Sequence, residues 1–105
     1  MDKNPEIFAL IKSIACKYLP GAKVMLFGSR ARKDNALDSD YDILVVSPQE
    51  ISPKQKIPLK TNIRKDLLKA GVRSDILIQS RKEVNKNKKL PGHIVKTIMH
   101  EAVLL

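Results

Sequence analysis

This 105-residue sequence has little cysteine and no long apolar run. The single cysteine, Cys16, cannot form an internal disulfide and has no partner for a metal site. Because Cys16 lies on the apolar side of a predicted helix, we interpret it as a core thiol. No stretch approaches the about 20 apolar residues of a membrane helix, and no signal-peptide pattern is present. We therefore expect a soluble, cytoplasmic protein with no membrane partner.

Aromatic residues are also scarce, at 4% of the chain, which leaves little capacity for base stacking. A protein that reads single-stranded nucleic acid is therefore not expected. The charge is strongly basic, with 20 Lys and Arg against 11 Asp and Glu and a formal net charge of +9. This balance favours a polyanionic partner, which can be a nucleic acid, a nucleotide or an acidic protein surface. A solvated lysine-rich surface would give the same count.

The length and the apolar content of 43% predict one globular domain over residues 1–105. Apolar residues at helical spacing predict three helices, over 5–19, 54–70 and 92–105, the last of which can end in an extended tail. Short apolar runs predict three strands, over 23–27, 40–46 and 75–79. A helical turn is expected from Ser29, and 81–89 is a basic stretch. Helices that alternate with strands indicate a small α/β fold.

The helices also carry terminal and facial signals. Asn4 can cap the first helix, with Pro5 at its first position, and Pro58 lies near the start of the second. The apolar residues expected to face the core are, helix by helix, Ile7, Leu10, Ile11, Ile14 and Tyr18; Ile57, Ile63, Leu67 and Leu68; and Ile94, Ile98 and Met99.

Asp40 and Asp42 lie at the start of the predicted second strand, where aspartate is usually disfavoured. Residues i and i+2 of a strand point to the same face, so the two carboxylates project together. At about 4 Å and an effective dielectric of about 20 they repel by about 4 kcal/mol, which protonation, solvent exposure or a cation must offset. Asp75 opens the third strand in the same way. If these strands are neighbours, the three carboxylates suit magnesium; the alternative is that they are strand-end turn residues.

The sequence Phe-Gly-Ser-Arg at 27–30 precedes the aspartates. Gly28 allows a sharp turn after a strand, and Ser29 then begins a helical turn whose free N–H groups and hydroxyl can hold a phosphate. Arg30 and Arg32 add positive charge beside it. A phosphate cradle after one strand and a carboxylate pair at the next can together hold a magnesium triphosphate.

Gly28-Ser29, a ten-residue spacer and Asp40-Tyr41-Asp42 resemble the signature of minimal nucleotidyltransferases, in the DNA polymerase beta superfamily. The likeness covers nearly the whole chain, with "SDILI" at 74–78 where that family has its third carboxylate. It implies a small polymerase-beta-like nucleotidyltransferase fold, with a mixed sheet of three or more strands packed against helices. Many relatives have glycine where this chain has Lys33, which removes an easy left-handed helix cap.

The resemblance implies an activity and a set of ligands. Asp40, Asp42 and Asp75 would be the catalytic residues and would bind two magnesium ions. Gly28, Ser29 and Arg32 would bind the phosphates of a nucleoside triphosphate, most simply ATP. A nucleoside monophosphate would pass to a hydroxyl, with Asp75 as a candidate proton acceptor.

The resemblance also implies a partner. Minimal nucleotidyltransferases are commonly encoded beside a HEPN-family protein, often an RNA-cleaving toxin, and some attach AMP to a tyrosine of that toxin as antitoxins. The alternative is a non-catalytic antitoxin that neutralises its partner by contact, although contact alone would not need three aspartates. A nucleic-acid partner is the weaker third hypothesis, because no recognition motif is present.

Overall fold

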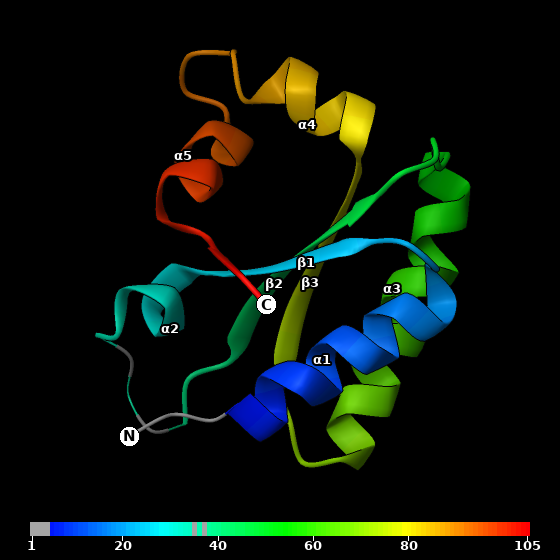
Figure 1. Ribbon diagram of the computed structural model, residues 1–105, viewed down its shortest axis with the longest axis vertical. Helices are drawn as coiled ribbons and strands as arrows, with labels where there is room; N and C mark the ends of the chain where they lie inside the picture. Colours follow the sequence, from blue (N-terminus) through cyan, green and yellow to red (C-terminus); the bar gives the residue numbers. More distant parts are fainter. Residues whose placement is uncertain (1–4, 35, 37) are drawn as a thin grey trace.

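The computed structural model describes residues 5–34, 36 and 38–105, and Figure 1 shows helices arranged around a central sheet. The helices are α1 (Pro5–Tyr18), α2 (Gly28–Arg32), α3 (Pro53–Lys69), α4 (Arg81–Asn87) and α5 (Ile94–Glu101). The strands are β1 (Lys23–Phe27), β2 (Tyr41–Ser47), β3 (Ser74–Ser80) and β4 (Val103–Leu104). The predicted cap, Asn4, lies outside the described residues.

The four strands form one mixed sheet in the order β3-β2-β1-β4. β1 runs antiparallel to both β2 and β4, whereas β2 and β3 are parallel and are connected through α3. This confirms the predicted α/β fold with a mixed sheet. The expected extended tail is β4, which adds a short strand beside β1. The basic stretch at 81–89 holds a helix, α4, that the charge pattern did not predict.

Two helices begin at capping boxes. The Ser52 side chain accepts a hydrogen bond from the Gln55 backbone N–H, and the Gln55 side chain accepts one from the Ser52 N–H. Ser80 and Glu83 do the same at α4. Pro53 follows Ser52 at the first position of α3, where its missing N–H costs nothing. These caps fix where α3 and α4 begin after β2 and β3, the strands that contain Asp42 and Asp75.

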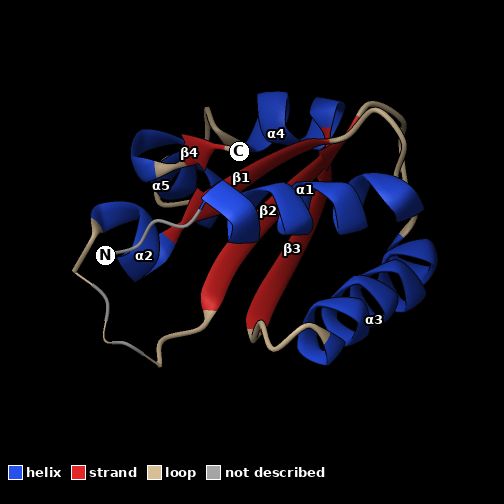
Figure 2. Cartoon of the chain, turned by 60° about the horizontal axis from the view of Figure 1, so that its bottom comes forward, coloured by secondary structure: helices blue, strands red, loops and turns tan. Residues whose placement is uncertain are grey.

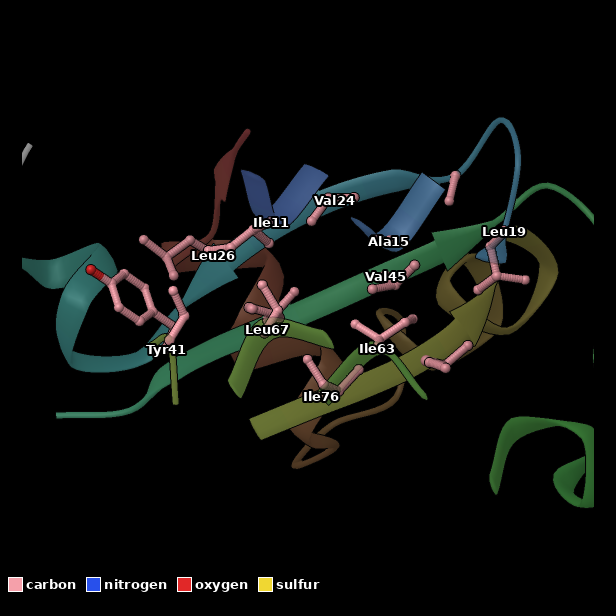
Figure 3. Close-up of a cluster of buried hydrophobic side chains, with 14 residues drawn as sticks. Ile11, Ala15, Leu19, Val24, Leu26, Tyr41, Val45, Ile63, Leu67 and Ile76 are labelled. Carbon is pink, nitrogen blue, oxygen red and sulfur yellow. The ribbon is translucent and has the colours of Figure 1, made fainter. Parts of the chain in front are cut away.

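The sheet is buried on both faces (Figure 3 shows one of the two clusters). On one face, Ile43 and Val45 of β2 contact residues of α1 and α3, such as Ile11 and Ile63. On the other face, Leu44 and Val46 contact α4 and α5. Successive side chains of a strand point to opposite faces, so a strand covered on both sides is apolar throughout. This accounts for the continuous run Ile43–Val46.

Three residues predicted to face the core are exposed instead. Ile57 and Leu68 are 67% and 57% exposed on α3, and Ile94 is 60% exposed at the start of α5. The inward stripe of α3 passes through Ile63 and Leu67, and Leu68 lies about 100° further around the helix. A helix that covers one edge of a sheet buries only a narrow stripe, so apolar residues beside that stripe remain at the surface.

Cys16 is half-buried against the core cluster of α1 and α3, as expected of a core thiol. No helix in the described chain combines the length and the apolar character needed to cross a bilayer.

Candidate active site

The last residue of β1 and the first residues of β2 and β3 lie together at one end of the sheet. Because β1 is antiparallel to β2, the last residue of β1, Phe27, pairs with Asp42 near the start of β2. β3 is parallel to β2, so Asp75 at its start pairs with Asp42 from the other side. Figure 2 shows the starts of β2 and β3 side by side, with α2 to one side of them and α3 to the other. The sheet thus brings together the glycine turn and two of the predicted carboxylates.

Gly28 makes the turn from β1 into α2 with a positive φ of 76°. A side chain does not fit there, because an added Cβ atom would lie 2.2 Å from Asp42 Oδ2. The backbone of the turn therefore lies directly against the carboxylate of Asp42. Ser29 follows, half-buried, and within the described residues its hydroxyl makes no hydrogen bond. The turn combines close backbone approach with a free hydroxyl, as a phosphate cradle requires.

The three predicted aspartates differ in their surroundings. Asp42 is half-buried, and burial raises the pKa of its carboxyl above the usual range. The negative charges of Asp75 and Asp40 raise that pKa further. Asp75 is exposed on the edge strand, and Asp40 is exposed one residue before β2 rather than inside it. Asp42 therefore lies in a field of like charge that favours binding of a proton or a cation.

Asp40 also has a cationic partner of its own. Its Oδ1 lies 3.3 Å from the Arg73 guanidinium Nε, in an ion pair at the surface. Arg73 also donates to the backbone carbonyl of Asp38. In the part of the chain that the structure describes, no three Asp, Glu, His or Cys side chains form a group that could hold a metal ion as they stand. The oxygen donors suit a hard cation such as magnesium, but they do not form a closed ligand set.

A carboxylate that the sequence did not predict lies at the glycine turn. Glu101, at the end of α5, accepts a hydrogen bond from the Gly28 N–H at 2.6 Å. Its two oxygens lie 3.1 and 3.3 Å from Arg32 Nη1. Arg32 also pairs with Asp34 at 3.2 Å. The basic residue expected to bind phosphate is therefore already bound to carboxylates, and Glu101 has the position and charge of an anion in the cradle.

Arg30 has a positioning role. Its guanidinium lies 4.0 Å from the centre of the Tyr41 ring, and its Nε donates to the Ser39 carbonyl at 2.9 Å. These contacts tie α2 to the segment that leads into β2. Of the two arginines after Ser29, Arg32 is thus the one whose charge lies at the turn.

A pocket of about 650 Å³ lies on the other side of the aspartates. It is formed by the second half of α3 and the start of β3, and Asp40 and Asp75 are part of its wall. We call it the α3 pocket. Its other lining residues include Lys60, Arg64 and Lys65, so a basic surface adjoins the carboxylates.

The sequence matches the profile of the family described as "Nucleotidyltransferase domain" over residues 9–105. The chain belongs to this nucleotidyltransferase family. The matched region includes the glycine turn, all three aspartates and Glu101. No curated protein matches the sequence.

Solved structures similar to this nucleotidyltransferase have its fold. One is a toxin–antitoxin with AMP-PNP, at TM-score 0.61 and 15% identity, over 92% of this chain and 70% of that chain. Another is the tri-AMPylated Shewanella oneidensis HEPN toxin in complex with MNT antitoxin, at TM-score 0.56 and 14% identity, over 93% and 67%. A third, assigned as a minimal nucleotidyltransferase, has TM-score 0.57 and 25% identity, over 93% and 88%. They confirm the predicted minimal nucleotidyltransferase fold.

Proposed function

We propose that this nucleotidyltransferase uses magnesium and ATP to transfer AMP to a hydroxyl of a partner protein, and that the partner is a HEPN-type toxin which the transfer neutralises. The observation that carries the proposal is the contact of the Gly28 turn with Asp42, beside Asp75. The turn can bind the phosphates, and the neighbouring carboxylates can bind the magnesium, of a magnesium triphosphate.

The glycine turn and the aspartates would bind different parts of the magnesium triphosphate. The Gly28–Ser29 backbone and the Ser29 hydroxyl would bind the β- and γ-phosphates, with Arg32 as the basic residue beside them. Asp40, Asp42 and Asp75 would hold two magnesium ions, which supply charge neutralisation at the phosphates and lower the pKa of the attacking hydroxyl. Asp40 must leave Arg73 for this, and the exposed ion pair between them costs little to break.

The transfer would replace one oxygen bonded to the α-phosphorus with another. The acceptor oxygen forms a bond to the α-phosphorus, and the bond from that phosphorus to the bridging oxygen of the β-phosphate breaks. Pyrophosphate leaves with the electron pair, and the hydroxyl proton passes to a base, for which Asp75 is the exposed candidate. Glu101 must give up the Gly28 N–H when the phosphates arrive.

The proposed partner and nucleotide rest on the neighbouring structures. Two similar folds come from toxin–antitoxin complexes, one with AMP-PNP and one with an AMPylated HEPN toxin. Their identity to this chain is 15% and 14%, so for this protein the HEPN partner, ATP and the acceptor tyrosine are proposals. A cytoplasmic location likewise stays a prediction.

A second candidate function is neutralisation by contact, without transfer. The ion pairs Asp40–Arg73 and Glu101–Arg32 favour it, because both engage the proposed ligands in the resting protein. The two functions differ in whether a magnesium nucleotide is bound at the glycine turn.

Titration calorimetry with ATP decides whether the nucleotide site exists. We expect magnesium to strengthen ATP binding to the wild type, and we expect the Asp40→Asn/Asp42→Asn variant to lose that gain. Lys54→Gln, on the exposed first turn of α3, is the control and should bind as the wild type does. Equal ATP affinity with and without magnesium in the wild type would contradict the proposed function.

A further inference from the structure

The α3 pocket has three basic side chains and two carboxylates, Asp40 and Asp75, in its wall. Lys60, Arg64 and Lys65 line it, and within residues 5–34, 36 and 38–105 none of the three forms an ion pair. Elsewhere on the same helix, Lys56 is bound to Glu83 at 2.9 Å. Three free cations on the wall of one pocket attract an anionic ligand.

The pocket also has apolar contact points. Leu68 is part of its wall and is 57% exposed. Ile57, on the same helix but outside the pocket, is 67% exposed. These are two of the residues that the sequence placed in the core. Exposed apolar side chains beside charged ones are typical of a surface that another protein covers.

The strand order places the α3 pocket on one side of the proposed site of phosphoryl transfer. In the order β3-β2-β1, the Gly28 turn follows β1, Asp42 lies on β2, and the α3 pocket lies at the β3 edge with Asp75 in its wall. In phosphoryl transfer, the attacking and the leaving oxygens lie roughly in line on opposite sides of the phosphorus. If pyrophosphate leaves on the Gly28 side, the β3 side is the opposite one, from which the acceptor hydroxyl would arrive.

We propose that the α3 pocket is the docking site for the acceptor, and that it takes an acidic segment of a partner protein whose hydroxyl reaches Asp75 at the β3 edge. This proposal rests on the proposed function and names the surface and the chemistry that select its acceptor. Carboxylates of the segment pair with Lys60, Arg64 and Lys65, and its apolar side chains contact Leu68.

A protein segment fits this pocket better than a nucleic acid does. Among the described residues that line it, none has an aromatic side chain on which a base could stack. Leu68 offers an apolar contact that a phosphate backbone cannot use. The positive charge alone would suit either a protein segment or a nucleic acid, so the experiment tests an acceptor of each kind.

The test uses ATP labelled at the α-phosphate, magnesium and three defined acceptors. Two are tyrosine peptides, flanked either by Asp and Glu or by Lys, and the third is an oligoribonucleotide with a free 3′-hydroxyl. We expect the wild type to label the acidic peptide about ten-fold more than the basic one. The Lys60→Glu/Arg64→Glu variant should lose this preference by about the same factor. Lys12→Glu/Lys54→Glu, which makes the same change in net charge on exposed residues outside the pocket, should keep it.

Nucleotide binding by the same preparations separates the inference from the proposed function. We expect the Lys60→Glu/Arg64→Glu variant to bind magnesium ATP as the wild type does, because its changes lie away from the Gly28 turn. Labelling of the oligoribonucleotide in preference to both peptides would overturn the inference, as would labelling that ignores the peptide charge. Loss of magnesium ATP binding in the pocket variant would also overturn it, because the pocket would then hold the nucleotide. If the wild type binds no magnesium ATP, the proposed function fails, and the inference fails with it.

Discussion

Replacing Asp42 with asparagine should stabilise the metal-free protein while it removes the proposed activity. Asp42 lies opposite Asp75 in the parallel ladder, and both burial and the charges of Asp75 and Asp40 raise the pKa of its carboxyl. At neutral pH the folded protein therefore bears the cost of a partly desolvated charge among like charges. Asparagine has nearly the same shape and carries no charge, so the cost disappears.

The size of the effect follows from the pairing. Like charges directly opposite on adjacent strands are destabilising on the scale of about 0.2–1 kcal/mol, and the release of a half-buried charge adds to this. We expect a gain of about 0.5–1 kcal/mol, which corresponds to roughly 2–8 °C in Tm for a domain of this size.

The pH dependence has a definite sign. A folded-state pKa above the unfolded value of about 3.9 means that the fold binds the Asp42 proton more tightly than the unfolded chain does. The cost is therefore absent below the unfolded pKa, grows as the pH rises through both pKa values, and is complete above the folded one. The advantage of Asp42→Asn should be full above the folded-state pKa and should fade in acid.

Asp66→Asn is the matched control with the opposite sign. Lys17 and Tyr18 donate hydrogen bonds to Asp66 at 2.6 and 2.7 Å and lower the pKa of its carboxyl. Asp66 thus contributes stability above its unfolded pKa that is lost as the pH falls, and its replacement should lower Tm at pH 7. Melting in chelator-treated buffer between pH 3 and pH 8 measures both variants. An Asp42→Asn protein that melts well below the wild type at pH 7 would refute the reasoning and make Asp42 a structural residue.

Three further substitutions test the glycine turn and its surroundings. Gly28→Ala should unfold more easily than Gly71→Ala in denaturant: both have positive φ, which costs alanine about 1–2 kcal/mol, but only Gly28 also faces Asp42. Equal losses would show that the Asp42 contact is unimportant. Lys33→Gly should raise the free energy of unfolding by about 0.5–1 kcal/mol, because Lys33 ends α2 at φ 65° in the left-handed region; an unchanged chemical melt would contradict this. Glu101→Gln should bind magnesium ATP roughly two- to five-fold more tightly by calorimetry, because one anion leaves the cradle. The control, Glu50→Gln, lies beyond the opposite end of β2 and should bind magnesium ATP as the wild type does. Weaker binding by Glu101→Gln would mean that Glu101 positions the turn for the nucleotide.

The parts of the site that local sequence determines could be predicted. β1 has the predicted bounds, 23–27, because the six residues between the Pro-Gly turn at 20–21 and Gly28 leave little choice. The Gly28 turn follows from a backbone conformation that glycine adopts readily and few other residues do. The pairing of Asp42 with Asp75 follows once the two strands are neighbours.

The remaining features depend on long-range packing. Glu101 is 73 residues from Gly28, and nothing near it in the sequence indicates that α5 ends beside α2. The Asp40–Arg73 pair likewise depends on how the loops before β2 and β3 meet. Ile57 and Leu68 have helical spacing typical of core residues, yet only the packing of α3 on the sheet decides which stripe is buried.

The measurement that tests the central claim most directly is the intact mass of a partner after incubation. The full-length protein, ATP, magnesium and a candidate HEPN protein from the same genome are combined, with wild type and Asp40→Asn/Asp42→Asn in parallel. The account predicts that the wild type adds whole adenylyl groups to the partner, and that the variant still binds the partner but adds none. A partner that is bound and neutralised equally by both proteins, with no change in mass, would contradict the account and establish neutralisation by contact.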